Sequence, residues 1–176
     1  CSVLAPFIYH FWEYKGETRS GLKFNIPPHG CSDLVFIVGN AADCIRNSLI
    51  MKPYHSYFFG PMNTFTELVA HTNFIHIIGV RFRPCGLFQF IEIPLNELAN
   101  QGIDSQEFPV LFSQSFIYQL CESNQNPIDI IEHELVRQVY KNNMDTEKQI
   151  SYAVSLISRQ KGIVSIKELA AEACLC

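Results

Sequence analysis

The stretch NFIHIIGVRFRP, residues 73–84, marks the place where the chain changes from strand-forming to helix-forming sequence. Residues 74–82 carry apolar side chains at positions that lie on both faces of a strand, which is typical of a closed or covered sheet. Past Pro84 the sequence takes on helical periodicity. The stretch therefore predicts a buried strand that closes a β-rich region.

Upstream of this strand, short β-type runs alternate with Gly, Pro and Asn. The runs are FIYHFWEY (7–14), GLKFNIPP (21–28), DLVFIVG (33–39), YHSYFFGP (54–61) and TFTELVA (64–70). Residues 34–38 resemble 74–82 in being apolar on both faces. Consecutive short strands favour a barrel or a sandwich over alternating βαβ units, so residues 1–93 are expected to be β-rich.

Residues 94–142 are expected to be helical. GLFQFIEIPLNELANQG (86–102) predicts a short helical turn and then a second short helix that ends near Gly102. Two longer helices are expected after Pro109 and Pro127. The second of these, 127–141, carries two apolar strips: one is Ile128, Ile131, Leu135 and Val139, and the other is Ile130, Val136 and Tyr140. One strip suffices for packing within a domain, so the helix is predicted to mediate homodimerisation.

A polar segment, 141–149, predicts a linker to a last pair of helices. The first helix carries Ile150, Ala153, Val154 and Ile157 at helical spacing and is expected to stop at Gly162. Ser165 is a good N-cap for the second helix, and Glu168 is placed to complete a capping box. The chain is thus predicted to be an α+β protein with a first domain, 1–142, and a second, 143–176.

Composition narrows the class of protein. The 176 residues are 48% hydrophobic and 17% charged, which supports a real core. The net charge of −4 disfavours DNA binding by this piece alone. No run reaches the roughly 18 apolar residues that a membrane span needs. The start is neither Met nor a secretory signal, so a piece of a longer protein is expected. The seven cysteines are odd in number and scattered, which favours free thiols in a reducing cytoplasm.

Three motifs resemble the AraC family of bacterial transcriptional regulators. They are Pro6–Ile8–Trp12 in a P-x-I-x-x-x-W pattern, Phe59–Gly60–Pro61, and Gly79-Val-Arg-Phe-Arg-Pro84 with Gly86. The resemblance implies a cupin-like β-barrel or sandwich that senses a small-molecule effector, followed by a helical subdomain for dimerisation. It also implies that 150–161 is a supporting helix, 166–173 the first helix of a helix-turn-helix, and CLC (174–176) its turn. The recognition helix would then be missing, so DNA is a partner of the full-length protein and not of this fragment, in which 141–176 hold five basic and four acidic residues.

The chain shows no catalytic or metal-binding pattern. A cupin metal site needs two His two residues apart on one strand, and no H-x-H occurs. No G-x-S-x-G, phosphate loop or meaningful Cys–His spacing is present either. We therefore expect no enzyme, no metal and no cofactor. Two alternatives stay open: a cupin-type small-molecule-binding protein or enzyme, and a ligand-free protein interaction module.

Four residues are candidates for an effector site: Trp12, Phe36, Arg81 and Phe82. The aromatic residues could equally belong to the core. Arg81 and Arg83 flank Phe82, so they are expected on the strand face opposite Val80 and Phe82. Two interpretations of the arginines remain: a structural pair that hydrogen-bonds the start of the helical part, or a guanidinium that recognises an anion at the mouth of a pocket.

Overall fold

The computed structural model describes residues 3–39, 42–44, 49–91, 96–107, 111–141 and 148–172. The chain forms two compact units, Cys1–Asn142 and Asn143–Cys176. The first unit contains antiparallel sheets and two of the helices, and the second contains the other two helices. The predicted α+β class is confirmed.

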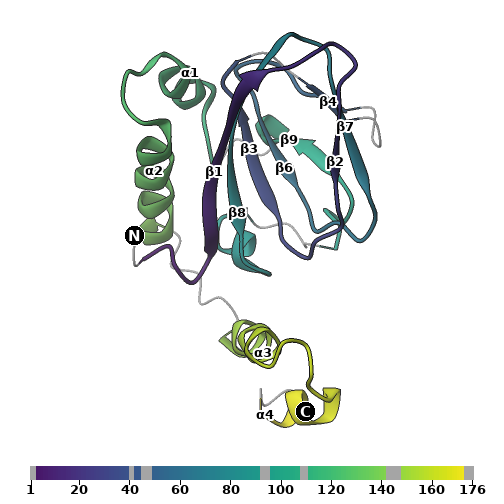
Figure 1. Ribbon diagram of the computed structural model, residues 1–176. Helices are drawn as coiled ribbons and strands as arrows, with labels where there is room; N and C mark the ends of the chain where they lie inside the picture. Colours follow the sequence, from purple (N-terminus) through teal and green to yellow (C-terminus); the bar gives the residue numbers. More distant parts are fainter. Residues whose placement is uncertain are drawn as a thin grey trace. The chain divides into compact units, whose positions relative to one another are not determined.

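The first unit is built on two antiparallel sheets (Figure 1). The five-stranded sheet has the order β1 (Ile8–Glu17), β8 (Phe74–Phe82), β3 (Asp33–Ile37), β6 (Ser56–Phe59), β9 (Gly102–Asp104). The four-stranded sheet has the order β2 (Lys23–Ile26), β7 (Thr66–Ala70), β4 (Ala42–Cys44), β5 (Leu49–Ile50). All six runs that were expected to be strands form strands.

Strand β3 is apolar on both faces because it lies between two hydrophobic cores. Leu34 and Phe36 point to one side of the five-stranded sheet and join a core with the helices. Val35 and Ile37 point to the other side and join a core that also contains residues of the four-stranded sheet, such as Leu68. Since successive side chains alternate between faces, a strand in the middle layer of three must be apolar throughout.

Helices α1 (Gln114–Glu122) and α2 (Pro127–Lys141) cover the outer face of the five-stranded sheet (Figure 1). The Ser113 hydroxyl accepts a hydrogen bond from the N–H of Phe116 and caps α1. Between β8 and α1, the expected helical turn is the short 3-10 helix η1 (Gly86–Gln89). The second short helix, which was expected to end near Gly102, does not form over residues 96–102. Residues 96–100 form turns instead, and β9 pairs with β6. Strands β4, β5 and β9 were not foreseen.

The two apolar strips of α2 both pack inside the first unit. Ile131 and Leu135 are fully buried, while Ile128 and Val139 lie against the same core. Ile130 and Val136, from the second strip, also pack against that core, and only Tyr140 is well exposed, at 71%. The expectation of a free apolar strip is therefore wrong. A helix on a broad sheet buries an apolar arc of 100° or more, which accommodates both strips.

The second unit consists of α3 (Lys148–Arg159) and α4 (Ile166–Glu172). Gly162 has a left-handed φ of 79°, and its N–H donates to the carbonyl of Ile157, so it ends α3 as expected. Ser165 and Glu168 form the predicted capping box: the Ser165 N–H donates to the Glu168 carboxylate, and the Glu168 N–H donates to the Ser165 hydroxyl. The expected turn at 174–176 lies outside the described residues. Among the described helices, none is long and apolar enough to cross a membrane.

Candidate ligand-binding site

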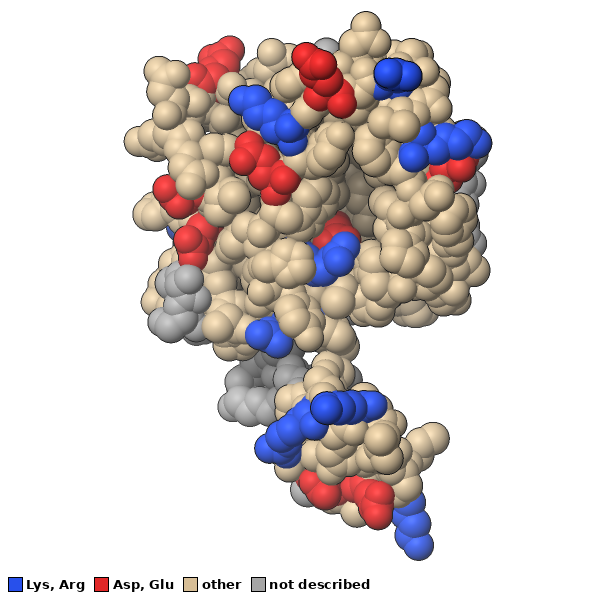
Figure 2. All heavy atoms as spheres, in the orientation of Figure 1, with Lys and Arg blue, Asp and Glu red and all other residues tan. Residues whose placement is uncertain are grey.

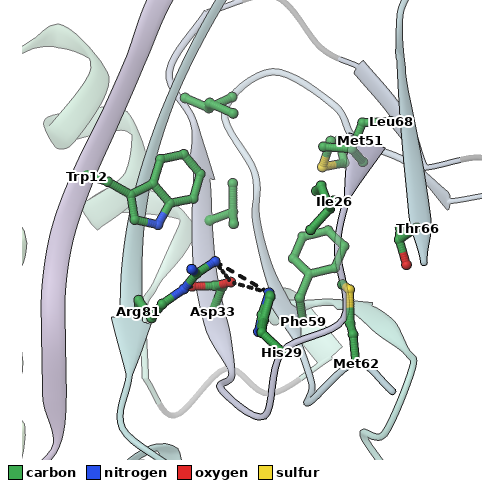
Figure 3. Close-up of a pocket in the computed structure, with 12 residues that line it drawn as sticks. Trp12, Ile26, His29, Asp33, Met51, Phe59, Met62, Thr66, Leu68 and Arg81 are labelled. Atoms are coloured by element: carbon green, nitrogen blue, oxygen red, sulfur yellow. Dashed lines mark hydrogen bonds and ion pairs between the residues drawn. The ribbon is translucent and has the colours of Figure 1, made fainter. Parts of the chain in front are cut away.

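A cavity of about 70 Å³ lies between the two sheets. The space-filling view shows a hollow on this face, with an acidic and a basic side chain in contact inside it (Figure 2). Strands of both sheets supply the walls, as the close-up shows (Figure 3). The lining residues are Trp12, Ile26, His29, Asp33, Val35, Met51, Phe59, Met62, Thr66, Leu68, Ile77 and Arg81.

Most of the cavity wall is apolar. Met51, Phe59 and Met62 are each less than 8% exposed and give the cavity a firm, largely hydrophobic lining. At 10–15 Å³ for each water-sized molecule, the volume holds roughly five to seven such molecules. The cavity is therefore suited to a small, mainly apolar ligand.

The register of the five-stranded sheet places the polar groups. In the register of β8 with β3, Arg81 lies directly opposite Asp33. Two residues away, Gly79 is the partner of Trp12 on β1. Because side chains two positions apart share a face, the indole ring and the charged pair meet on the side that faces the cavity.

Trp12 depends on Gly79 for its position. A Cβ atom added at Gly79 would overlap the indole ring. The glycine thus lets the ring lie flat over the neighbouring strand. The ring nitrogen Nε1 is buried and, within the described part of the chain, has no hydrogen-bond partner. An indole N–H can only donate, so this donor is available to an acceptor inside the cavity.

Arg81 and Asp33 form a two-point ion pair. Nε of Arg81 donates to Oδ1 of Asp33 at 2.9 Å, and Nη2 donates to Oδ2 at 2.8 Å. The Asp33 side chain is only 8% exposed and that of Arg81 is 29% exposed. The hydrogen bonds to Asp33 raise the pKa of the Arg81 guanidinium, against the opposing effect of burial. The pair is charged and internally neutral, as a buried pair must be to tolerate desolvation.

His29 completes the polar cluster. Its Nδ1 lies 3.1 Å from the carbonyl oxygen of Cys31, which can only accept, so Nδ1 carries the proton. In the neutral ring Nε2 then accepts from Nη2 of Arg81 at 3.4 Å. Burial raises the pKa of the nearby Cys31 thiol, despite the opposing effect of Arg81, so this cysteine stays a thiol at neutral pH.

Two of the four candidate residues line the cavity and two do not. Trp12 and Arg81 belong to its wall. Phe36 and Phe82 are fully buried on the opposite face of the sheet, where Phe36 packs edge-on against Phe112 and Phe82 packs against Phe90. Strand alternation separates them, because each is one residue out of phase with the cavity side.

The second arginine, Arg83, contacts the N-terminal segment of the chain. Nε of Arg83 donates to the carbonyl of Ala5 at 2.8 Å, and its guanidinium lies 4.6 Å from the centre of the Tyr9 ring. It therefore fastens the segment before β1. Residues 92–95, at the start of the expected helical part, lie outside the described residues. Among the described residues the two arginines bind different partners, Asp33 for Arg81 and Ala5 for Arg83. Their expected hydrogen bonds to the start of the helical part stay a prediction.

Sequence reasoning missed the acidic and imidazole members of the cluster. Asp33 carried a usable signal: it is a lone charge at the head of the apolar run DLVFI and has the same parity as Val35. His29 lies in a loop, where no periodicity predicts its direction. Among the residues that the structure describes, no group of three or more His, Cys, Asp or Glu side chains is arranged to hold a metal ion.

A family model described as a domain of unknown function (DUF6597) matches residues 1–104. The chain belongs to the DUF6597 family. The matched DUF6597 region ends with the last residue of β9, so it contains both sheets and every residue of the cavity wall. No curated protein matches the chain.

Solved structures of ToxT from Vibrio cholerae resemble this DUF6597 chain at low identity. Apo ToxT K231A from strain SCE256 has 9% identity and a TM-score of 0.42, over 92% of this chain and 69% of ToxT. The P21 form of ToxT has 13% identity and a TM-score of 0.37, over 93% of this chain and 88% of ToxT. A third structure is ToxT of strain O395 bound to (E)-4-(8-methylnaphthalen-1-yl)but-3-enoic acid. It has 12% identity and a TM-score of 0.36, over 93% of this chain and 89% of ToxT. The family assignment rests on the sequence match alone.

Proposed function

We propose that this DUF6597 chain is the effector-sensing part of a transcriptional regulator of the AraC type. In this proposal the cavity between the sheets binds a small molecule, and α3 and α4 belong to the domain that binds DNA in the full-length protein. A ligand-free interaction module, the main non-enzymatic alternative, would be favoured by a filled interior. The cavity supports a binding function instead.

The observation that carries the proposal is the meeting of three sequence motifs at one cavity. Trp12 ends the first motif, Phe59 begins the second, and Gly79 and Arg81 belong to the third. Trp12, Phe59 and Arg81 line the cavity, and Gly79 supports the Trp12 ring. Segments far apart in sequence that carry one family resemblance thus build one site.

The second unit supports the DNA-binding part of the proposal. A helix that ends at a left-handed glycine is followed, after a short turn, by a helix with a capping box. This is a local arrangement of the kind that precedes a recognition helix in helix-turn-helix proteins. Ile163 and Ile166 are more than 80% exposed in it, so this unit has apolar surface that further helices of a DNA-binding domain would cover.

The test joins ligand binding to DNA binding. Trp12 is the only tryptophan, so its fluorescence reports directly on the cavity during a small-molecule screen. Compounds that bind are then added to the full-length protein on labelled DNA from upstream of its own gene. We expect at least one of them to change the affinity, and we expect Gly79→Ala to abolish this response while Gly30→Ala, which has open space around its Cβ, keeps it. Full-length protein that shows no sequence-selective DNA binding would overturn the proposal.

Homodimerisation through 127–141 stays a prediction, with a smaller contact surface than the sequence indicated. Its exposed apolar contribution is Tyr140, beside the partly buried Val136. Sedimentation of the parent protein and of Tyr140→Glu tests it: the parent should dimerise and the variant should be monomeric. A parent that remains monomeric at about 100 μM would rule out this helix as a dimer interface.

A further inference from the structure

The cavity contains a hydrogen-bond donor that the protein does not satisfy. The Trp12 indole N–H is buried and lacks an acceptor among the described residues. Figure 3 shows the nitrogen side of the ring turned toward Arg81 and Asp33. A buried donor without an acceptor costs free energy, which a ligand that brings an acceptor would recover. The cavity therefore favours a ligand oxygen at this place.

The charge of Arg81 is already matched inside the cavity. Its Nε and Nη2 both donate to Asp33, whose carboxylate is almost inaccessible to solvent, and Nη2 also lies 3.4 Å from Nε2 of His29. An anionic ligand would have to share the guanidinium with Asp33 and would be repelled by it. A cationic ligand would be repelled by the positive charge of Arg81, which lines the cavity. The internally neutral pair thus disfavours ligands of either charge.

Size sets a second limit. The volume of about 70 Å³ corresponds to a molecule of roughly five to seven non-hydrogen atoms, at 10–15 Å³ for each. Met51, Phe59 and Met62 provide apolar contact for the remainder of such a molecule. Only a short carbon skeleton with one polar group meets both limits.

We propose that the cavity selects an uncharged, mostly apolar small molecule whose carbonyl or amide oxygen accepts the hydrogen bond of Trp12 Nε1. This inference rests on the proposed sensing function, because it names the class of effector for the same cavity. It replaces the view of Arg81 as an anion receptor. Asp33 neutralises the charge of the guanidinium, so the ion pair forms a polar part of the cavity wall without net charge.

The experiment compares two probes of equal size and different charge. Propionamide and propionate have the same number of non-hydrogen atoms, and propionate is ionised at neutral pH. In a proton–nitrogen correlation spectrum of the nitrogen-labelled protein, the single indole N–H gives one resonance that can be followed during titration. We expect propionamide to move this resonance downfield with saturation, and propionate to bind at least about tenfold more weakly.

Two results would overturn the inference. One is propionate binding as tightly as propionamide. The other is an indole resonance that does not move with propionamide up to about 100 mM, the weak end of the range for a ligand this small. Asp33→Asn provides a matched variant, because it keeps shape and one oxygen for Arg81 but removes the negative charge. It should shift the preference toward propionate by about tenfold, and an unchanged preference in a folded variant contradicts the charge argument.

These outcomes are separable from the proposed function. The wild-type comparison needs no DNA and no variant, so it decides the ligand class even if Asp33→Asn fails to fold. Ligand-dependent DNA binding with a preference for acids would refute only the ligand class. Absence of selective DNA binding by the full-length protein would refute the regulator and leave the cavity preference standing.

Discussion

Replacing Gly79 by alanine tests how the cavity wall is built. The added methyl group would overlap the Trp12 ring, which lies on the neighbouring strand and not at the end of a flexible chain. Overpacking of this kind costs about 1–3 kcal/mol, and the stiff indole places Gly79→Ala near the upper part of that range, at about 2–3 kcal/mol. For a chain of this size, that loss lowers the melting temperature by about 4–12 °C.

Gly30→Ala is the matched control. Neither glycine has a positive φ, so neither requires the backbone freedom of glycine. A Cβ at Gly30 meets open space. This variant should be neutral or more stable by about 0.4–1 kcal/mol, since alanine restricts the unfolded chain. The difference between the two variants therefore isolates the contact with Trp12.

Circular dichroism during thermal and urea unfolding is the suitable assay, because it does not depend on Trp12 emission. A double-mutant cycle with Trp12→Leu adds a direct measure of the contact. In that background the cost of Gly79→Ala should fall by about 2 kcal/mol, which is within the range for residues in contact. If Gly79→Ala is as stable as Gly30→Ala, the described packing of Trp12 on β8 is wrong.

Three further predictions concern other parts of the chain. Residues 1–176 alone should give no salt-resistant, sequence-selective shift of DNA in a gel, because their net charge is −4; such a shift would contradict the assignment of α3 and α4. Hydrogen bonds from the Ser165 side chain and N–H lower the pKa of Glu168. The capping box should therefore stabilise α4 above the ordinary Glu pKa and lose this effect as pH falls through the lowered value. Ser165→Ala, which keeps only the backbone hydrogen bond, should weaken the pH dependence of the protection factors of the α4 amides, that is, of their exchange rates after correction for intrinsic exchange. Burial raises the pKa of Cys121 to about 11, so at pH 8 its alkylation should be about a hundredfold slower than that of an ordinary cysteine, and mass spectrometry of modified peptides measures this.

The sequence was sufficient for elements whose signals are local. The capping box of Ser165 and Glu168 and the stop at Gly162 appear as expected, because each depends on a few neighbouring residues. The longer strands were also predictable, since buried runs such as DLVFI have few alternatives. The short strands β4, β5 and β9 have only two or three residues, and such pairing is decided by partners elsewhere in the sheet.

The candidate site was predictable only in part, for the same reason. Trp12 and Arg81 stood out as an aromatic and a charged residue in strands, yet nothing local separates Phe36 from a cavity residue. Its direction is decided by the parity of β3 relative to Asp33, and that parity has meaning only after the register with β8 is known. The wide apolar arc of α2 likewise needed the sheet beneath it before its two strips could be assigned.

The cavity and the helices share one structural wall, strand β8. On one side of this strand Ile77 and Arg81 line the cavity. On the other side Val80 and Phe82 belong to the core that contains Leu135 of α2. Because protein interiors are packed closely, a ligand that shifts β8 changes the packing of the helical layer as well. The alternation of a single strand thus gives the cavity and the core of α2 a common wall.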